Sequence, residues 1–222
     1  GTQHLGNYFG AMRQNIALSN DPNYEAYIFL ADMHALTTVK DPAMLKKMST
    51  DLMLDYLALG LDPEKTTFFQ QSAVSAHTEL AWILACLTPH GLLERAHSWK
   101  DALAKGVKDT TAGLFTYPVL MTADILLYKP DLVPVGKDQK QHLEIARDIA
   151  MKFNNQYGET FPLPEEYTPK EVAVVPGTDG QKMSKSYGNT IEFFAPENVL
   201  KKQVMGIVTD STPVEDPKDP EK

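Results

Sequence analysis

The chain has 222 residues, of which 43% are hydrophobic and 23% are charged, and its mean hydropathy is −0.28. These values are typical of a globular protein that is large enough to fold around its own core without cross-links. Cys86 is the only cysteine, which excludes an internal disulfide and favours a reducing, cytoplasmic location. No run of about 18 uncharged apolar residues is present, so the sequence predicts no membrane-spanning helix.

The charge balance is acidic, with 21 Lys and Arg against 29 Asp and Glu, a net charge of −8 and an isoelectric point near 5.2. This composition excludes a nonspecific nucleic-acid binder, which needs a large basic surface. Any polyanionic partner must therefore meet a local cluster of basic groups. The Pro-rich, charged segment 213–222 (PVEDPKDPEK) is typical of a linker or a frayed end.

Four short apolar runs alternate with segments of helical periodicity. The runs, which suit strands buried on both faces, are 27–31 (YIFLA), 66–70 (TTFFQ), 132–135 (LVPV) and 172–175 (VAVV). Helices are predicted over 44–59 and 139–153, the second with Ala146, Ile149, Ala150 and Phe153 on one face. This alternation predicts an α/β fold with a parallel sheet, in which ligands bind where strands lead into helices.

The first candidate motif is His4-Leu5-Gly6-Asn7, at the start of a segment with helical spacing. Asn7 is a good helix N-cap, and Gly6 permits close approach of a ligand or of the backbone. A helix N-terminus and two side-chain donors would suit a phosphate group. These four residues alone are explained at least as well by a capped helix with an incidental histidine.

The second motif is stronger and covers residues 180–186 (GQKMSKS), between Gly177 and Gly188. Lys182 and Lys185 would supply two ammonium groups, and Ser184 and Ser186 two hydroxyls, to clamp a polyphosphate. A solvated turn with surface lysines is the structural alternative.

The two motifs together resemble those of the class I aminoacyl-tRNA synthetases, whose first motif usually reads HIGH and whose second reads KMSKS. Here Leu5 and Asn7 depart from the first motif, whereas residues 182–186 match the second completely. Residues 114–148 are similar to the tryptophanyl members of this class, and the similarity runs from Gly1 to about Pro213. The tyrosyl members share the Gly-x-Asp-Gln element at residues 136–139 but differ from the MTADI sequence at 121–125.

The resemblance implies a Rossmann-like catalytic domain over 1–194, with helices on both faces of a parallel sheet, and the start of a helical region at 195–222. It also implies that a first strand and most of an anticodon-binding domain lie outside the given sequence. The implied reaction is activation of tryptophan with ATP, followed by transfer to tRNA(Trp). Mg²⁺ would be carried by the triphosphate, no protein-ligated metal is expected, and the implied assembly is a homodimer with weak tRNA binding by this chain.

The resemblance also assigns roles to individual residues. The catalytic residues would be His4, Lys182 and Lys185. The ATP-binding residues would be Gly6, Asn7, Gly136, Lys137, Asp138, Val175, Lys182, Met183, Ser184, Lys185 and Ser186. The tryptophan-binding residues would be Asp124, Met121, Tyr117, Gln139, His34, Val133 and Val135.

Physical chemistry supports the proposed amino-acid site to a degree. Tyr117, Met121 and Asp124 share one helical face, and Asp124 has apolar neighbours in sequence. A carboxylate in such surroundings needs a donor. An indole N–H would serve, and so would an internal Lys or Arg. Asp138 is explained equally well as a helix cap, and His34 as a turn residue, while His77, His90 and His142 are interpreted as structural or surface groups.

Three alternatives remain open from the sequence. A tyrosyl-type synthetase is the nearest, and a non-catalytic paralogue that senses tryptophan is the second. Another adenylyl-transferring enzyme, such as a nucleotidyltransferase, is disfavoured because such enzymes lack the complete KMSKS sequence.

Overall fold

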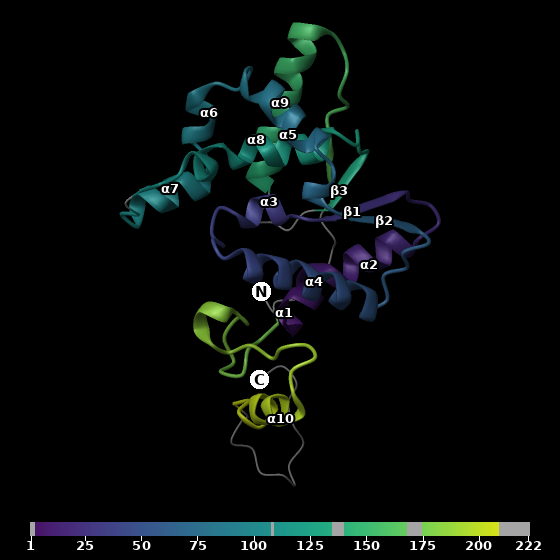
Figure 1. Cartoon of the computed structure of the whole chain (residues 1–222), viewed down its shortest axis with the longest axis vertical. Coiled ribbons are helices and arrows are strands. Elements are labelled where there is room, and N and C mark those ends of the chain that lie inside the picture. The colour runs from purple at the N-terminus through teal and green to yellow at the C-terminus, as the bar shows by residue number, and fades with distance from the viewer. Residues whose placement is uncertain (1–2, 108, 135–139, 168–174, 209–222) are drawn as a thin grey trace. The chain divides into compact units, whose positions relative to one another are not determined.

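The computed structural model describes residues 3–107, 109–134, 140–167 and 175–208 (Figure 1). The chain forms two compact units. The larger unit comprises residues 15–171, and the smaller unit joins residues 1–14 to residues 172–222. The predicted boundary between a catalytic domain (1–194) and the start of a helical region (195–222) does not coincide with the boundaries of these units, and it stays a prediction.

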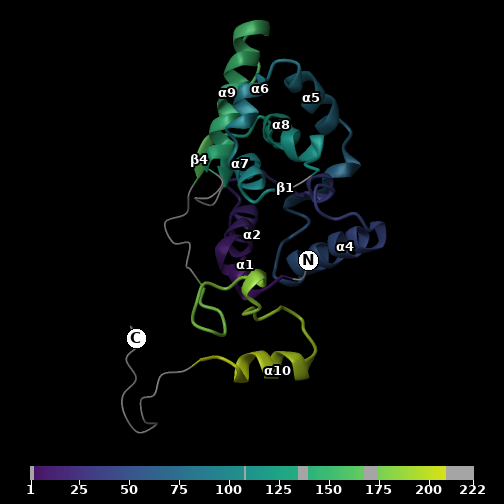
Figure 2. The ribbon, with the colours of Figure 1, turned by 90° about the vertical axis from the view of Figure 1, so that its left-hand side faces the viewer.

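Within the larger unit and the first residues of the chain, short strands alternate with helices (Figures 1 and 2). In chain order the elements are α1 (Leu5–Asn7), the π-helical segment η1 (Tyr8–Met12), α2 (Arg13–Asn20), β1 (Ala26–Leu30), α3 (Asp32–Ala35), α4 (Pro42–Ala58), β2 (Thr66–Gln70), the 3-10 turn η2 (Gln71–Ala73), α5 (Ala76–Ala85), α6 (His90–Glu94), α7 (His97–Ala104), α8 (Ala112–Leu126), β3 (Leu132–Pro134), α9 (Lys140–Tyr157) and β4 (Glu165–Tyr167). The smaller unit also contains the 3-10 turn η4 (Lys185–Tyr187) and α10 (Glu197–Met205).

The strands form two parallel pairs in the described part of the chain. β1 pairs with β2 from Ala26 opposite Thr66 to Leu30 opposite Gln70, and β3 pairs with β4. Three of the predicted strands are therefore present. The partner of β3 was not predicted, because β4 begins with Glu165 and Glu166 and has no apolar run. Residues 172–174 of the fourth predicted strand lie outside the described residues, and Val175 is not in a strand.

Helices cover both faces of the β1–β2 pair. Phe68 and Phe69 are consecutive in β2, so their side chains point to opposite faces. The ring of Tyr56 in α4 lies 5.6 Å from that of Phe68, whereas the ring of His77 in α5 lies 6.1 Å from that of Phe69. Figures 1 and 2 show α4 on one side of these strands, and α5 and α8 on the other. The predicted parallel α/β arrangement with helices on both faces is thus present around this pair.

The main hydrophobic core lies among the helices of the larger unit. It is formed by buried side chains of α5, α6, α8 and α9 and by the segments that join or follow them: Leu84, Leu92, Leu93, Ala96, Val119, Ala123, Leu126, Ile145, Ile149, Ala150 and Phe161. The predicted helix over 139–153 is confirmed as α9, with Ala146, Ile149 and Ala150 buried and Phe153 packed beside them. This core holds α8 in place, and α8 carries several candidate site residues.

The predicted helix over 44–59 is confirmed as α4, which begins two residues earlier. The carboxylate of Asp41 caps it by accepting hydrogen bonds from the N–H groups of Ala43 and Met44. Pro42 at the first helical position lacks an N–H group that the helix could not have used.

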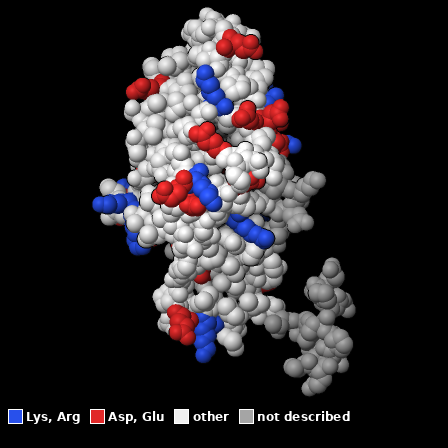
Figure 3. Space-filling model, turned by 90° about the vertical axis from the view of Figure 1, so that its right-hand side faces the viewer, with Lys and Arg blue, Asp and Glu red and all other residues white. Residues whose placement is uncertain are grey.

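No helix of the described residues is long and apolar enough to cross a membrane. On the face shown in Figure 3, acidic and basic side chains are interspersed.

The packing of the core predicts that shortening one of its buried side chains lowers the stability of the fold. Leu84 in α5 is fully buried, so Leu84→Ala should lower the free energy of unfolding by about 2 to 5 kcal/mol, through lost burial and the cavity left behind. Urea denaturation of the whole chain would measure this. Leu54→Ala is the matched control, because Leu54 in α4 is 58% exposed and its truncation should change the free energy by less than about 0.5 kcal/mol. Equal effects would contradict the assignment of the core.

Candidate active site

The first motif lies in the smaller unit, where the two distant parts of the chain meet. His4 forms an antiparallel bridge with Glu192, and the N–H of Leu5 donates to the carbonyl of Ile191 at 3.0 Å. The helix begins after His4, which is its N-cap. Asn7 is therefore not the N-cap that its residue type suggested. It is the third helical residue, and its side-chain oxygen accepts from the N–H of His4 at 3.1 Å.

Gly6 has the close approach that the sequence indicated. A Cβ at this position would lie 3.0 Å from the imidazole of His4 and 3.3 Å from Cβ of Met183. The N–H of Gly6 donates to the sulfur of Met183 at 3.3 Å. The structure thus brings the first motif into direct contact with the KMSKS sequence, and a side chain at position 6 would crowd both His4 and Met183.

His4 is 5% exposed, and its Nδ1 has no hydrogen-bond partner within the described residues. Burial lowers the pKa of His4, and the positive charge of Lys185 lowers it further, while Glu192 opposes both. A buried ring nitrogen without a partner is costly and is suited to a polar ligand atom.

Asn189 organises the loop that carries the KMSKS residues. Its side-chain oxygen accepts from the N–H of Ser184 at 2.8 Å, and its amide donates to the carboxylate of Asp179 at 2.7 Å and to the carbonyl of Lys182 at 3.2 Å. The hydrogen bond from Asn189 lowers the pKa of Asp179. A Cβ on Gly177 would lie 2.3 Å from the Asn189 side chain, so this glycine is needed for packing.

The remaining residues of the second motif are nearer the solvent. Lys182, Lys185 and Ser186 are exposed, Ser184 is half-buried, and the two serine hydroxyls lie 2.8 Å apart. Gly188 ends the turn η4 with a φ of 65°, which a side chain would strain. The backbone is therefore fixed at Ser184 and Gly188, while the two ammonium groups remain available to a ligand.

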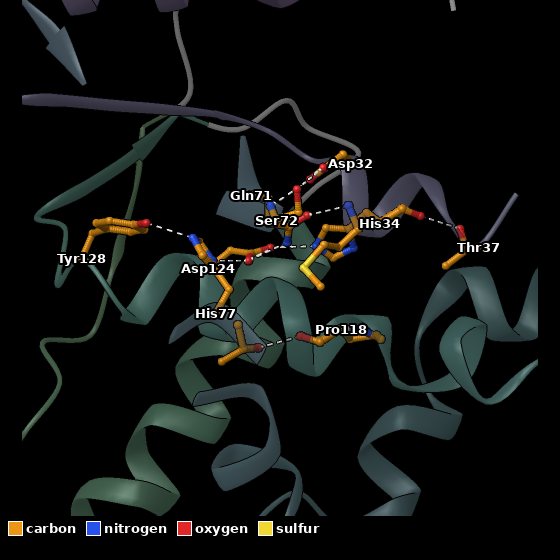
Figure 4. A network of polar contacts seen from close by, with 11 residues as sticks. Asp32, His34, Thr37, Gln71, Ser72, His77, Pro118, Asp124 and Tyr128 are labelled. Atoms are coloured by element: carbon orange, nitrogen blue, oxygen red, sulfur yellow. Dashed lines mark hydrogen bonds and ion pairs between the residues drawn. The ribbon is translucent and has the colours of Figure 1, made fainter. Parts of the chain in front are cut away.

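Asp124 is the centre of a second site, within the larger unit (Figure 4). It lies on α8, is 4% exposed, and accepts three short hydrogen bonds. Nε2 of Gln71 and Nδ1 of His77 lie 2.8 and 2.7 Å from its Oδ1, and Nε2 of His34 lies 2.7 Å from its Oδ2. The donors come from η2, α5 and α3, so this carboxylate ties three elements to α8.

Within the described residues, the groups that satisfy Asp124 are the side chains of Gln71, His77 and His34, and no Lys or Arg forms an ion pair with it. The N–H of Met33 donates to the side-chain oxygen of Gln71 at 3.1 Å, which orients the amide so that its nitrogen faces Asp124. An ionised carboxylate offers about four acceptor positions, so the three donors in the described part of the chain leave one, on Oδ2.

Three of the predicted amino-acid site residues lie together. His34 contacts Asp124, and its ring centroid lies 6.1 Å from that of Tyr117, with the rings edge to face. The Tyr117 hydroxyl lies 2.6 Å from Oγ of Ser98 and 2.7 Å from Nε2 of His142. Met121 is half-buried on the same helix, between Tyr117 and Asp124 in sequence.

The contacts of the remaining predicted site residues say less about ligand binding. Val133 is half-buried in β3, opposite Glu166 of β4, and Val175 is half-buried and accepts a hydrogen bond from the N–H of Met183 at 2.9 Å. The predicted residues that lie outside the described residues are Val135, Gly136, Lys137, Asp138 and Gln139.

Sequence analysis missed three members of the Asp124 network. His77 was interpreted as a structural or surface group, yet it is fully buried against Asp124. Gln71 is also fully buried, and the hydroxyl of Tyr128 lies 2.8 Å from Nε2 of His77. One signal could have found His77 and Gln71, since both follow β2 in the region where a parallel sheet places ligand-binding residues. His142 is half-buried against Tyr117, while His90 is exposed and its ring centroid lies 4.8 Å from that of Phe115.

Metal-ligand geometry is absent from the described part of the chain, where no group of three or more His, Cys, Asp or Glu side chains could hold a metal ion.

Comparisons with known proteins give a consistent result. A family model described as tRNA synthetases class I (W and Y) matches residues 1–219. A tryptophan–tRNA ligase of Fusobacterium nucleatum is 60% identical over the whole chain, which covers 67% of that protein, and one of Rhodopirellula baltica is 56% identical over 99% of the chain, covering 68% of that protein. The crystal structure of tryptophanyl-tRNA synthetase from Campylobacter jejuni, complexed with ADP and tryptophan, is similar with a TM-score of 0.92 and 55% identity. It is matched over the whole of this chain and 68% of its own.

The fold, the contact between the HLGN and KMSKS sequences, and these matches agree with one another. The α/β fold with parallel strands is the fold of the matched catalytic domains. This chain belongs to the tryptophanyl-tRNA synthetases, within the class I synthetases for tryptophan and tyrosine.

Proposed function

We propose that this protein is a tryptophan–tRNA ligase, which activates L-tryptophan with ATP and transfers the tryptophanyl group to tRNA(Trp). Its relatives carry that activity in their names, and 60% identity over the whole chain supports the same activity here. The observation that carries the substrate assignment is the buried Asp124 carboxylate, with one acceptor position left on Oδ2.

In the first step the carboxylate of tryptophan attacks the α-phosphorus of ATP. A new P–O bond forms, the bond to the bridging oxygen breaks, and pyrophosphate leaves. The attacking carboxylate is already ionised at neutral pH, so no side chain needs to act as a base. Catalysis then depends on positioning the reactants and on stabilising the charge of the phosphates.

We assign the phosphate-binding role to His4, Lys182 and Lys185. The unpaired Nδ1 of the buried His4 ring and the two exposed ammonium groups support this assignment. Gly6, Asn7, Met183, Ser184 and Ser186 would complete the ATP site in the smaller unit. Mg²⁺ would enter with ATP, bound mainly by phosphate and water oxygens.

We assign the amino-acid site to the larger unit, with Asp124 as acceptor for the indole N–H. This N–H is a donor with no acceptor character, and the carboxylate is an acceptor only, so the two are complementary. His34 and Tyr117 would flank the same site, and Met121 would contact the indole ring. Tyr117 would approach the substrate ammonium group through its hydroxyl, which already contacts Ser98 and His142.

Two further partners follow from the same assignment. Binding of tRNA(Trp) is expected to be weak for this chain, because it is acidic overall and acids and bases are interspersed on the face in Figure 3. A homodimer is expected as well. Trp82 and Ile83 on α5 are 73% and 48% exposed, and a second copy would cover such apolar surface.

Asp124→Asn should damage tryptophan-dependent ATP–pyrophosphate exchange while leaving ATP affinity unchanged. The amide would turn an acceptor into a donor, and the expected loss in kcat/KM for tryptophan is about 5- to 150-fold. Asp124→Ala should be worse, since it also leaves three donors unsatisfied, of which Gln71 and His77 are fully buried. Unchanged kinetics in Asp124→Asn would remove this residue from the site.

Lys182→Ala and Lys185→Ala should each lower kcat by about 10²- to 10³-fold, with a smaller change in the KM for tryptophan, because the lost charge acts on the phosphates in the transition state. Steady-state pyrophosphate exchange measures both constants. Lys201→Ala, on the exposed surface of α10, is the control and should leave both unchanged. A variant that raises only the KM for tryptophan would contradict the phosphate role.

Ligand-induced thermal stabilisation should separate this function from the tyrosyl alternative. Tryptophan at about 100 times its Kd should raise Tm by on the order of 5 to 10 °C, whereas tyrosine at the same concentration should not. A larger shift with tyrosine would overturn the substrate assignment. Binding of tryptophan without pyrophosphate exchange would instead support a non-catalytic sensor.

A further inference from the structure

His77 lies in a chain of hydrogen bonds that the proposed reaction does not yet use. Its ring is fully buried, with Nδ1 2.7 Å from Oδ1 of Asp124 and Nε2 2.8 Å from the hydroxyl of Tyr128. Figure 4 shows the three side chains in line, with Tyr128 at one end and Asp124 at the other.

Each hydrogen bond in this series has a defined donor and a defined acceptor. A carboxylate accepts hydrogen bonds only, so Nδ1 of His77 must carry the proton that it donates to Asp124. In this tautomer a neutral ring presents Nε2 as an acceptor, and the hydroxyl of Tyr128 donates to it. Burial raises the pKa of Tyr128, and the negative charge of Asp124 raises it further, so this hydroxyl keeps its proton. Tyr128 thereby holds His77 in the tautomer that Asp124 requires.

Aromatic rings from both strands hold the imidazole in place. Its centroid lies 5.5 Å from that of Phe29 in β1, 6.1 Å from that of Phe69 in β2 and 5.5 Å from that of Tyr128. A ring enclosed on these sides and hydrogen-bonded at both nitrogens cannot turn without losing contacts.

The two oxygens of Asp124 are consequently unlike. Oδ1 accepts from both Gln71 and His77, whose side chains are fully buried. Among the described residues, Oδ2 accepts from His34 alone, whose side chain is 21% exposed. The buried pair therefore fills one oxygen and turns the other, with its remaining acceptor position, toward the accessible side.

We infer that His77, held by Tyr128, is a positioning residue that aims Oδ2 of Asp124 at the ring N–H of the substrate and so contributes to selection for a bicyclic amino acid that carries this donor. The inference rests on the proposed function, because it assumes that Asp124 reads the indole nitrogen. It adds a residue that acts through Asp124 without touching the substrate.

The test compares tryptophan with 3-(benzothiophen-3-yl)alanine, in which sulfur replaces the ring N–H in a similar bicyclic shape. The readout is the ratio of kcat/KM for the two amino acids in ATP–pyrophosphate exchange by the whole chain. His77→Leu should lower kcat/KM for tryptophan by about 10- to 100-fold, mainly through KM, and change that for the analogue by less than about 3-fold. Tyr128→Phe should act in the same direction by about 2- to 10-fold.

Two variants separate positioning from packing. His77→Asn keeps an N–H donor near the position of Nδ1 and should retain more of the selectivity than His77→Leu. Thr122→Val is the matched control, because Thr122 is fully buried on α8 and its hydroxyl donates to the carbonyl of Pro118 at 2.8 Å, away from the network. It should leave the selectivity ratio unchanged even where it lowers Tm.

An equal loss of kcat/KM for both amino acids in His77→Leu would overturn the inference. It would also be overturned if the kcat/KM ratio of His77→Asn were no closer to that of the unmodified chain than the ratio of His77→Leu. If His77→Leu does not fold, an unchanged ratio in Tyr128→Phe overturns it instead. Failure of the proposed function looks different: the unmodified chain would then fail to exchange pyrophosphate with tryptophan, or Asp124→Asn would keep its preference for tryptophan. Loss of preference in Asp124→Asn but not in His77→Leu would remove only the role of His77.

Discussion

The hydrogen bonding of one buried carboxylate ties α3, η2 and α5 of the larger unit to α8. Asp124 is 4% exposed, so its charge is tolerated only while donors surround it. Those donors come from three elements, and two of them are oriented by a further contact: Gln71 by the N–H of Met33, and His77 by the hydroxyl of Tyr128. Removing the carboxylate would leave the buried donors Gln71 and His77 unsatisfied at once, so the local fold and the proposed binding chemistry depend on the same residue.

In the smaller unit, the loop that carries Lys182 and Lys185 is held beside the N-terminus of α1. Close approach is achieved with glycines, since Gly6 leaves room for His4 and Met183, and Gly177 leaves room for Asn189. Asn189 then fixes the loop through hydrogen bonds to the backbone of Ser184 and Lys182 and to the carboxylate of Asp179, without using a lysine side chain. The groups that hold the loop are thus separate from the ammonium groups of Lys182 and Lys185, which are exposed.

Local patterns predicted what depends on local sequence. The strands β1 and β2, the buried face of α9, and a carboxylate in need of a donor could all be read from periodicity and residue type. The β4 strand could not, because Glu165 and Glu166 give no apolar signal and their pairing depends on β3. The position of His77 after β2 could have marked it as a candidate, but its contact with Asp124 could not be predicted, because that contact forms only when α5 packs on α8. The prediction that Asn7 is the N-cap was wrong, because residue type alone suggested it. The helix begins earlier, directly after His4, which forms a bridge with Glu192.

The choice of partners for Asp124 bears directly on selectivity. A bidentate arginine would occupy both carboxylate oxygens and neutralise their charge, leaving little for a substrate. Three single donors leave one acceptor position, and placing two of them on Oδ1 decides that the open position is on Oδ2. In the proposed amino-acid site, a substrate whose ring offers an N–H would fill that position, and one that lacks it would leave a buried acceptor unpaired, at a free-energy cost that apolar contacts alone do not impose. Discrimination at this proposed site would therefore depend on how firmly Oδ1 is held by Gln71 and His77.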